Sequence, residues 1–133
     1  MNFEKIAKDA KEASLKIADL STELKNQALL KIADAIEADK EKVFEANKED
    51  LKSAEELVKS GEITKSTFNR LKLDENKMRD MLQGIRDIAS LEDPIGKKLL
   101  VRELDTDLTL YKISCPIGVL GIIFEARPDV IAQ

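Results

Sequence analysis

The sequence contains no histidine and a single cysteine, Cys115, among its 133 residues. Without histidine, the chain cannot carry out Ser-His or Cys-His catalysis, and only carboxylates and one thiol could bind zinc. One cysteine cannot form an intrachain disulfide, which favours a reducing, cytoplasmic location. A complete active site would therefore need residues that this chain does not contain.

Long apolar runs and basic blocks are also absent. The longest apolar run, residues 117–124, is much shorter than the ~20 residues that a membrane-spanning helix needs. The 26 acidic and 22 basic residues give a net charge of -4 and are interleaved, so no basic block can neutralise phosphates. The N-terminus lacks the apolar core of a signal peptide. We therefore expect neither export nor a membrane or nucleic-acid partner.

The first 96 residues repeat apolar side chains at the three-and-four spacing that is typical of amphipathic helices. The predicted helices are residues 3–20, 22–47, 48–60, 64–70 and 74–91. Asn47 is expected to end the second helix and mark a bend, because asparagine tolerates a left-handed conformation. Gly61 is expected to stop the third helix, and Thr64 to cap the fourth.

A different pattern follows Gly96. Two short apolar stretches flank the turn sequence Asp105-Thr106-Asp107, which predicts a β-hairpin. The segment GVLGIIF, residues 118–124, then has the continuous apolar character of a strand buried on both faces. Its glycines, Gly118 and Gly121, are explained by close backbone packing within that strand. Such a strand needs neighbouring strands, and only nine residues follow, so we expect the sequence to end within the fold.

Three blocks of the sequence resemble the gamma-glutamyl phosphate reductase family, within the aldehyde dehydrogenase superfamily. They are residues 20–51, residues 70–96, and CPIGVLGIIFEARPDV at 115–130. The third block is similar to the family signature P-x-G-V-x-G-I-I-[YF]-E-x-RP and is the most specific of the three. The resemblance implies a truncated α/β fold of the aldehyde dehydrogenase type. Its parts would be an N-terminal helical segment (1–96), a β-hairpin (97–115), and the first strand of a nucleotide-binding sheet in an incomplete NADP-binding domain (116–133).

The resemblance also implies an activity. Members of the family reduce L-glutamate 5-phosphate to L-glutamate 5-semialdehyde with NADPH and release phosphate, in proline biosynthesis. The family's catalytic cysteine lies beyond Gln133, so this chain alone is expected to be inactive. Cys115 has no evident base nearby and is expected to be a buried structural cysteine. The hairpin at 97–115 matches part of the superfamily's oligomerisation arm, which implies a homo-oligomer at full length.

The third block supplies the candidate site residues. Ile123, Phe124 and Glu125 are the expected cofactor contacts, since they follow the strand that leads into the family's cleft. Arg127 is expected to bind a substrate phosphate, because a guanidinium can hold phosphate oxygens through two parallel hydrogen bonds. The alternatives are that Ile123 and Phe124 belong to the core, and that Arg127 pairs with Glu125 or Asp129. No metal site is expected.

Two other functions remain open from the sequence. One is the reductase portion of a pyrroline-5-carboxylate synthase, although a start at Met1 argues against a preceding kinase domain. The other is a non-enzymatic acidic helical module that binds a partner. The apolar segment at 118–124 counts against the module, because a purely helical protein has no use for a buried strand.

Overall fold

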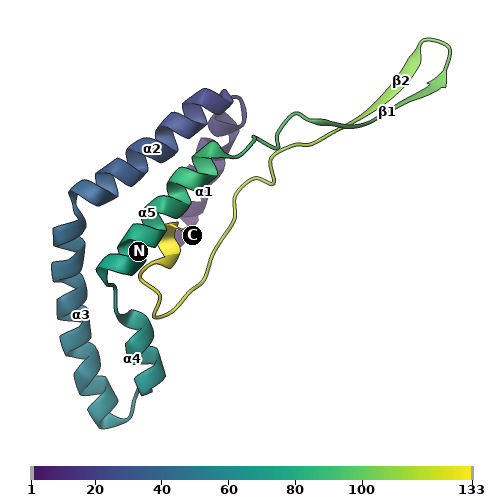
Figure 1. The fold of residues 1–133 in the computed structure, drawn as a ribbon. Coiled ribbons are helices and arrows are strands. Elements are labelled where there is room, and N and C mark those ends of the chain that lie inside the picture. Colours follow the sequence, from purple (N-terminus) through teal and green to yellow (C-terminus); the bar gives the residue numbers. More distant parts are fainter. Residues whose placement is uncertain (1, 133) are drawn as a thin grey trace. The chain divides into compact units, whose positions relative to one another are not determined.

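The computed structural model describes residues 2–132, which form five α-helices, one β-hairpin and a C-terminal 3-10 turn (Figure 1). The elements are α1 Phe3–Ala18, α2 Thr22–Ala38, α3 Lys40–Ser60, α4 Lys65–Leu71, α5 Glu75–Ser90, β1 Lys98–Asp105, β2 Leu108–Ile113 and η1 Val130–Ala132. They group into two compact units, Met1–Leu24 with Leu91–Gly121, and Lys25–Ser90 with Ile122–Gln133. No helix in the described part of the chain has the length and apolar character to cross a membrane.

Two of the predicted helix-end residues, Gly61 and Thr64, are confirmed, and Asn2 caps α1 without having been predicted to. Asn2 accepts a hydrogen bond from the Lys5 amide at the start of α1, and Thr64 accepts one from the Thr67 amide at the start of α4. These bonds satisfy backbone donors that have no partner within the helix. Gly61 ends α3 with φ 81°, a left-handed conformation that a residue without Cβ adopts at little cost.

The prediction that Asn47 ends a helix is wrong. The break falls at Asp39, and α3 then runs without interruption from Lys40 to Ser60. The Asn47 side chain is 6% exposed and contacts the connection between α4 and α5. Its Nδ2 donates to the Leu71 carbonyl at 2.9 Å, and its Oδ1 accepts from the Leu73 amide at 3.0 Å. Asn47 thus makes a tertiary contact, which the local helix pattern does not reveal.

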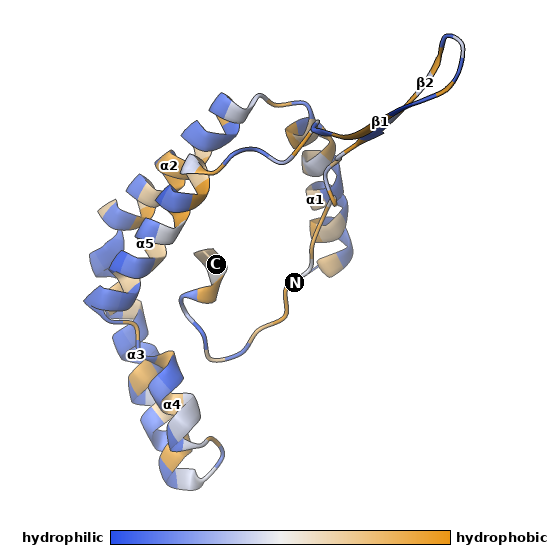
Figure 2. Ribbon diagram, turned by 45° about the vertical axis from the view of Figure 1, so that its right-hand side comes forward, coloured by the Kyte–Doolittle hydropathy of each residue, from blue (hydrophilic) through white to orange (hydrophobic). Residues whose placement is uncertain are grey.

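The second unit has a small apolar core between α2 and α5. Ala33 from α2 packs with Met78, Leu82 and Ile85 from α5, and Ala132 of η1 packs against the same cluster. Figure 2 shows how apolar and hydrophilic residues alternate along these helices. At the edge of the core, Arg86 lies 2.6 Å from the Glu37 carboxylate and 3.5 Å from that of Asp34. The hydrogen bond to Glu37 raises the pKa of Arg86, so the guanidinium stays positively charged.

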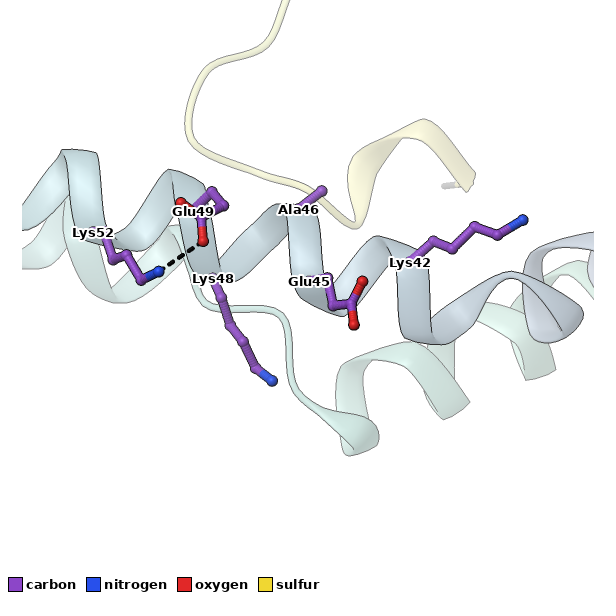
Figure 3. Close-up of a pocket in the computed structure, with 6 residues that line it drawn as sticks. All are labelled: Lys42, Glu45, Ala46, Lys48, Glu49 and Lys52. Carbon is purple, nitrogen blue, oxygen red and sulfur yellow. Dashed lines mark hydrogen bonds and ion pairs between the residues drawn. The ribbon is translucent and has the colours of Figure 1, made fainter.

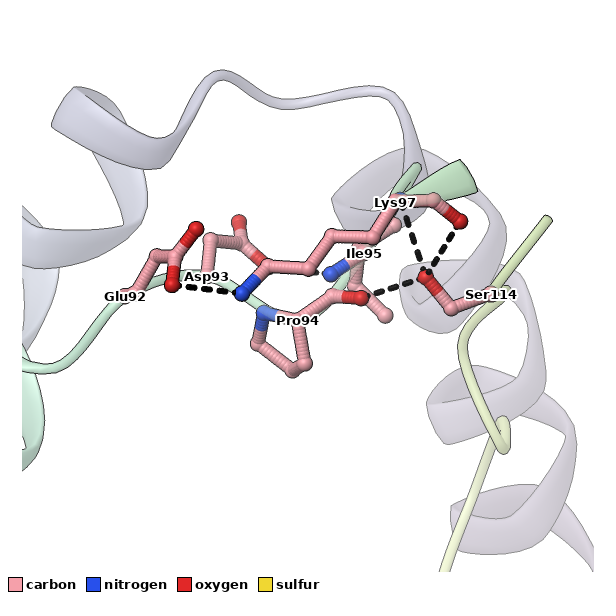
Figure 4. Close-up of polar contacts among 6 residues, drawn as sticks. All are labelled: Glu92, Asp93, Pro94, Ile95, Lys97 and Ser114. Atoms are coloured by element: carbon pink, nitrogen blue, oxygen red, sulfur yellow. Dashed lines mark hydrogen bonds and ion pairs between the residues drawn. The ribbon is translucent and has the colours of Figure 1, made fainter. Parts of the chain in front are cut away.

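The first unit carries the hairpin that the sequence predicted. β1 and β2 pair antiparallel, with Val101 opposite Tyr111, and Asp107 adopts φ 61° in the turn. Every residue of both strands is exposed. At the base of the hairpin, the Ser114 hydroxyl donates to the Pro94 carbonyl and accepts from the Lys97 amide (Figure 4). These hydrogen bonds hold the two chain segments together at the open end of the hairpin.

The same unit is tied together by Asp93, directly before the hairpin. One oxygen of its carboxylate accepts from the Ile95 amide at 2.9 Å, and the other accepts from the Thr22 hydroxyl at 3.0 Å. The start of α2 is thereby linked to a residue 71 positions away in the sequence. Lys97 and Glu92 add an ion pair at 2.7 Å over this turn (Figure 4).

The predicted buried strand at 118–124 does not form. The segment carries no strand, and its apolar side chains are exposed, with Ile123 fully so. Close packing around the glycines is also absent: a Cβ at Gly118 or Gly121 would meet no atom within 4 Å, and Gly118 has φ 104°. A strand is stable only when a neighbour accepts and donates its hydrogen bonds. In the described residues, β1 and β2 are the only paired strands, and they pair with each other.

Candidate functional site

The predicted cofactor residues lie in the exposed segment that leads to η1. Ile123 and Phe124 are exposed apolar side chains, and the Glu125 side chain is exposed beside them. They are therefore not part of the core, which was the alternative for the first two. Ala126 has φ 55°, which few residues other than glycine adopt, and the chain bends sharply there. The bend separates the residues predicted to contact cofactor from Arg127.

Arg127, the predicted phosphate ligand, lies just after this bend. Its guanidinium is 4.0 Å from the Asp129 carboxylate, so one of the two ion pairs considered from the sequence is present. The carbonyl of Arg127 also accepts from the Val130 amide at 3.3 Å, at the start of η1. Because Ala132 packs on the core between α2 and α5, the loop that carries Arg127 is attached to that unit. Phosphate binding by Arg127 stays a prediction.

A cavity of about 240 Å³ lies between α4 and the Glu125–Ala126 bend. Its lining residues come from both ends of α4, from the preceding turn and from the bend: Glu62, Ile63, Thr64, Thr67, Arg70, Glu125 and Ala126. Arg70 donates from Nη2 to the Thr67 hydroxyl at 3.5 Å, and the Thr64 and Thr67 hydroxyls lie 3.0 Å apart. The structure thus brings Glu125 to the same cavity as a cation, Arg70, that the sequence analysis did not single out.

A sequence signal for this cavity does exist. Thr64, Thr67 and Arg70 are three residues apart, and side chains at that spacing lie on one face of a helix. What the sequence could not supply is the partner surface, because Glu125 lies 55 positions after Arg70 and approaches it only through the fold of the second unit. The polar face of α4 alone would have been interpreted as a solvated surface.

A second hollow lies along α3 and has a different character. Figure 3 shows its lining, which alternates in charge along one helix: Lys42, Glu45, Ala46, Lys48, Glu49 and Lys52. Lys52 and Glu49 form an ion pair at 2.7 Å between neighbouring turns. All six residues come from one helix, and charges of opposite sign lie within one turn of each other, so this hollow is a solvated helix surface.

The expectation that Cys115 is buried is wrong, because its side chain is exposed. It follows the hairpin directly, in a stretch where 116–124 also lies open to solvent. The apolar surroundings that would bury it were expected from the strand at 118–124, which does not form. Within the described range, no group of three or more acidic, cysteine or histidine side chains could hold a metal ion.

Comparison with known proteins connects the chain to one enzyme. No family model matches the sequence. The chain is 59% identical over 128 residues to gamma-glutamyl phosphate reductase of Brachyspira hyodysenteriae, covering 96% of this chain and 30% of that protein. It is 47% identical to the gamma-glutamyl phosphate reductase of Methanosarcina barkeri, over 93% of this chain and 28% of that protein. It is also 47% identical to the enzyme of that name from Ruminiclostridium cellulolyticum, over 100% of this chain and 30% of that protein. The chain thus spans about 30% of the length of the curated relatives it matches.

Two solved structures resemble the fold, and both are titled gamma-glutamyl phosphate reductase. The Saccharomyces cerevisiae protein aligns with a TM-score of 0.88 and 44% identity, over 99% of this chain and 33% of that chain. The Thermotoga maritima protein aligns with a TM-score of 0.89 and 26% identity, over 99% and 31%. The chain therefore has the fold of the corresponding part of these structures.

Proposed function

We propose, from the premise that this chain corresponds to the N-terminal part of gamma-glutamyl phosphate reductases, that the full-length protein reduces L-glutamate 5-phosphate to L-glutamate 5-semialdehyde. Phosphate is released, and the product serves proline biosynthesis in the cytoplasm. The observation that carries the proposal is 59% identity across 96% of the chain. The signature at 116–128, with its E-x-RP ending, supports it, because amphipathic packing does not demand that combination.

NADPH is the proposed cofactor, and it would supply a hydride to the acyl carbon. Ile123, Phe124 and Glu125 fit one wall of a cofactor site, since two exposed apolar side chains can contact an apolar ring face. We propose that the rest of the cofactor site comes from the remainder of the full-length protein. We expect the chain alone to be inactive, because the catalytic cysteine that the family resemblance implies lies beyond Gln133.

Arg127 is proposed to bind the phosphate of the substrate. A guanidinium offers donors in a fixed fork that matches phosphate oxygens, and this one lies on a loop attached to the core through η1. Its guanidinium lies 4.0 Å from the Asp129 carboxylate, on the other side of Pro128 in the sequence. When substrate binds, the guanidinium would hold the phosphate and offset the negative charge that develops on the leaving group.

The test uses Arg127→Lys in the full-length reductase. Lysine keeps the charge and removes the paired donors, so we expect kcat/KM for L-glutamate 5-phosphate to fall by about ten- to hundredfold. Arg79→Lys on α5 is the matched control, because Arg79 is exposed and pairs only with its neighbour Asp80. An unchanged kcat/KM in Arg127→Lys would overturn the role of Arg127, and absence of NADPH-dependent reduction in the unaltered protein would overturn the function.

The hairpin is proposed to join subunits of a homo-oligomer at full length. Both of its faces are exposed, although it carries apolar side chains such as Val101 and Leu110. An exposed apolar edge of this kind is normally covered by a partner. Val101→Lys in the full-length protein should reduce the mass measured by light scattering, whereas Ser53→Lys on the surface of α3 should not. Equal masses for both variants would contradict this role.

A further inference from the structure

The cavity between α4 and the Glu125–Ala126 bend has a mixed charge that no assignment above explains. Its lining contains one cation, Arg70, and two carboxylates, Glu62 and Glu125. Arg70 and Glu125 form no ion pair with each other among the residues that the structure describes, so a cavity separates them instead of a direct contact. A ligand that carries both charges would satisfy both sides. We propose that this cavity binds the zwitterionic head group of an α-amino acid.

Arg70 is held in place for this role by bonds to its backbone and the residues that follow. Asn47 binds the Leu71 carbonyl at 2.9 Å and the Leu73 amide at 3.0 Å, and Lys77 Nζ donates to the Arg70 carbonyl at 3.4 Å. The guanidinium itself donates to Thr67. A cation whose backbone is already held in place loses less entropy when a ligand binds. Arg70 therefore takes the carboxylate of the ligand through charge-assisted hydrogen bonds.

The two carboxylates provide the complementary side for an ammonium group. Glu125 lies on the bend at Ala126, which is attached to the same unit through η1. Glu62 comes from the turn before α4, where its carboxylate also accepts from the Ser60 hydroxyl at 2.9 Å. With one cation and two anions, the lining carries a net charge of -1, which favours a ligand with an ammonium group over a dicarboxylate.

The volume of the cavity further limits the class of ligand that it can bind. A cavity of about 240 Å³ is below the ~300–1,000 Å³ that is typical for drug-sized ligands, and it suits a small amino acid. The inference rests on the proposed function, since L-glutamate 5-phosphate carries such a head group. Glu125 and Arg127 are two residues apart, so their Cα atoms are at most about 7 Å apart. One small substrate can therefore place its head group at Glu125 and its phosphate at Arg127.

This role for the Glu125 carboxylate differs from the cofactor contact proposed above for the same residue, and substitution separates the two. In the full-length reductase, Glu125→Gln should raise KM for L-glutamate 5-phosphate by about tenfold and leave KM for NADPH within twofold. A change confined to KM for NADPH would assign Glu125 to the cofactor and overturn its part in the amino-acid site.

Binding is tested directly on the 133-residue chain with L-glutamate as the probe. We expect backbone amide shifts in NMR spectra confined to residues 62–70 and 125–127, saturating with a Kd on the order of 1 mM. Glutarate, which lacks the ammonium group, should bind at least about tenfold more weakly. Arg70→Gln should weaken L-glutamate binding by a similar factor, and Arg70→Lys by less.

The matched control is Lys65→Gln, which removes one positive charge from the same helix outside this cavity. Its binding of L-glutamate should be unchanged, and far-UV circular dichroism identifies any variant that has lost its helices. Equal binding of L-glutamate and glutarate, or equal losses in Arg70→Gln and Lys65→Gln, would overturn the proposal. The test of this site and the test of the proposed function can fail separately. If the 133-residue chain binds no L-glutamate but the full-length protein is an active reductase, only this site is refuted. If the chain binds L-glutamate but the full-length protein has no reductase activity, only the function is refuted.

Discussion

The buried contact of Asn47 leads to the sharpest prediction on stability. The side chain is 6% exposed, and its two polar atoms each bind a backbone group in the connection between α4 and α5. Asn47→Ala removes both hydrogen bonds and leaves the Leu71 carbonyl and the Leu73 amide without them. The Asn47 side chain therefore links α3 to this connection through two hydrogen bonds.

The magnitude follows from three contributions. Two hydrogen bonds at about 1 kcal/mol each, plus part of the ~1–3 kcal/mol penalty for leaving a buried polar group unsatisfied, give a loss of about 3 kcal/mol. Alanine recovers roughly 0.6 kcal/mol, because it favours the interior of a helix more than asparagine does. We expect Asn47→Ala to lower the free energy of unfolding by about 2–3 kcal/mol.

Two measurements check the prediction. Urea unfolding followed by circular dichroism at 222 nm gives the free energy, and hydrogen exchange at the Leu73 amide reports the lost acceptor directly. Asn69→Ala is the matched control, since Asn69 is exposed on α4. A loss for Asn47→Ala within about 0.5 kcal/mol of the control, with unchanged protection of the Leu73 amide, would refute this account of the contact.

Three further predictions concern other parts of the structure. Arg86→Ala should lower the free energy of unfolding, and the loss should shrink in 1 M NaCl if the pair with Glu37 causes it. Gly61→Ala should cost about 1 kcal/mol through its left-handed φ alone, because an added Cβ meets no atom within 4 Å; no loss in urea unfolding would contradict this. Hydrogen bonds from its own backbone and from Ser21 lower the pKa of Glu23, so the stability it contributes should be present above the ordinary pKa of a glutamate and be lost as pH falls through the lowered pKa. NMR titration should give a pKa below that ordinary value, and Glu23→Gln should flatten that part of the pH profile.

Much of the secondary structure could be predicted from the sequence because its signals are local. Thr64 and Gly61 act on backbone groups within a few residues, and the turn at 105–107 lies directly between the strands it joins. Asn47 was misinterpreted because its partners lie 24 and 26 positions away. An asparagine that caps a helix and one that binds a distant loop look alike in the sequence.

The candidate site was predicted only in part. The signature supplied the candidate site residues within 123–127, and the ion pair between Arg127 and Asp129 was one of the alternatives considered. The cavity beside Glu125 was missed, since no local pattern connects that residue with Arg70. Cys115 was expected to be buried because no base lies near it, and the segment at 118–124 because an apolar run implies a core; both are exposed.

The sequence by itself determined the helices, the hairpin and the relation to gamma-glutamyl phosphate reductases, because spacing, capping residues and a glycine-containing signature are properties of neighbouring residues. The tertiary structure decided which polar groups meet across the chain: Asn47 with the α4–α5 connection, Thr22 with Asp93, and Glu125 with the cavity at Arg70. It also decided that 118–124 is not a strand. Hydrogen bonds between distant segments depend on a partner being in place, and an apolar run becomes a strand only where another strand can pair with it.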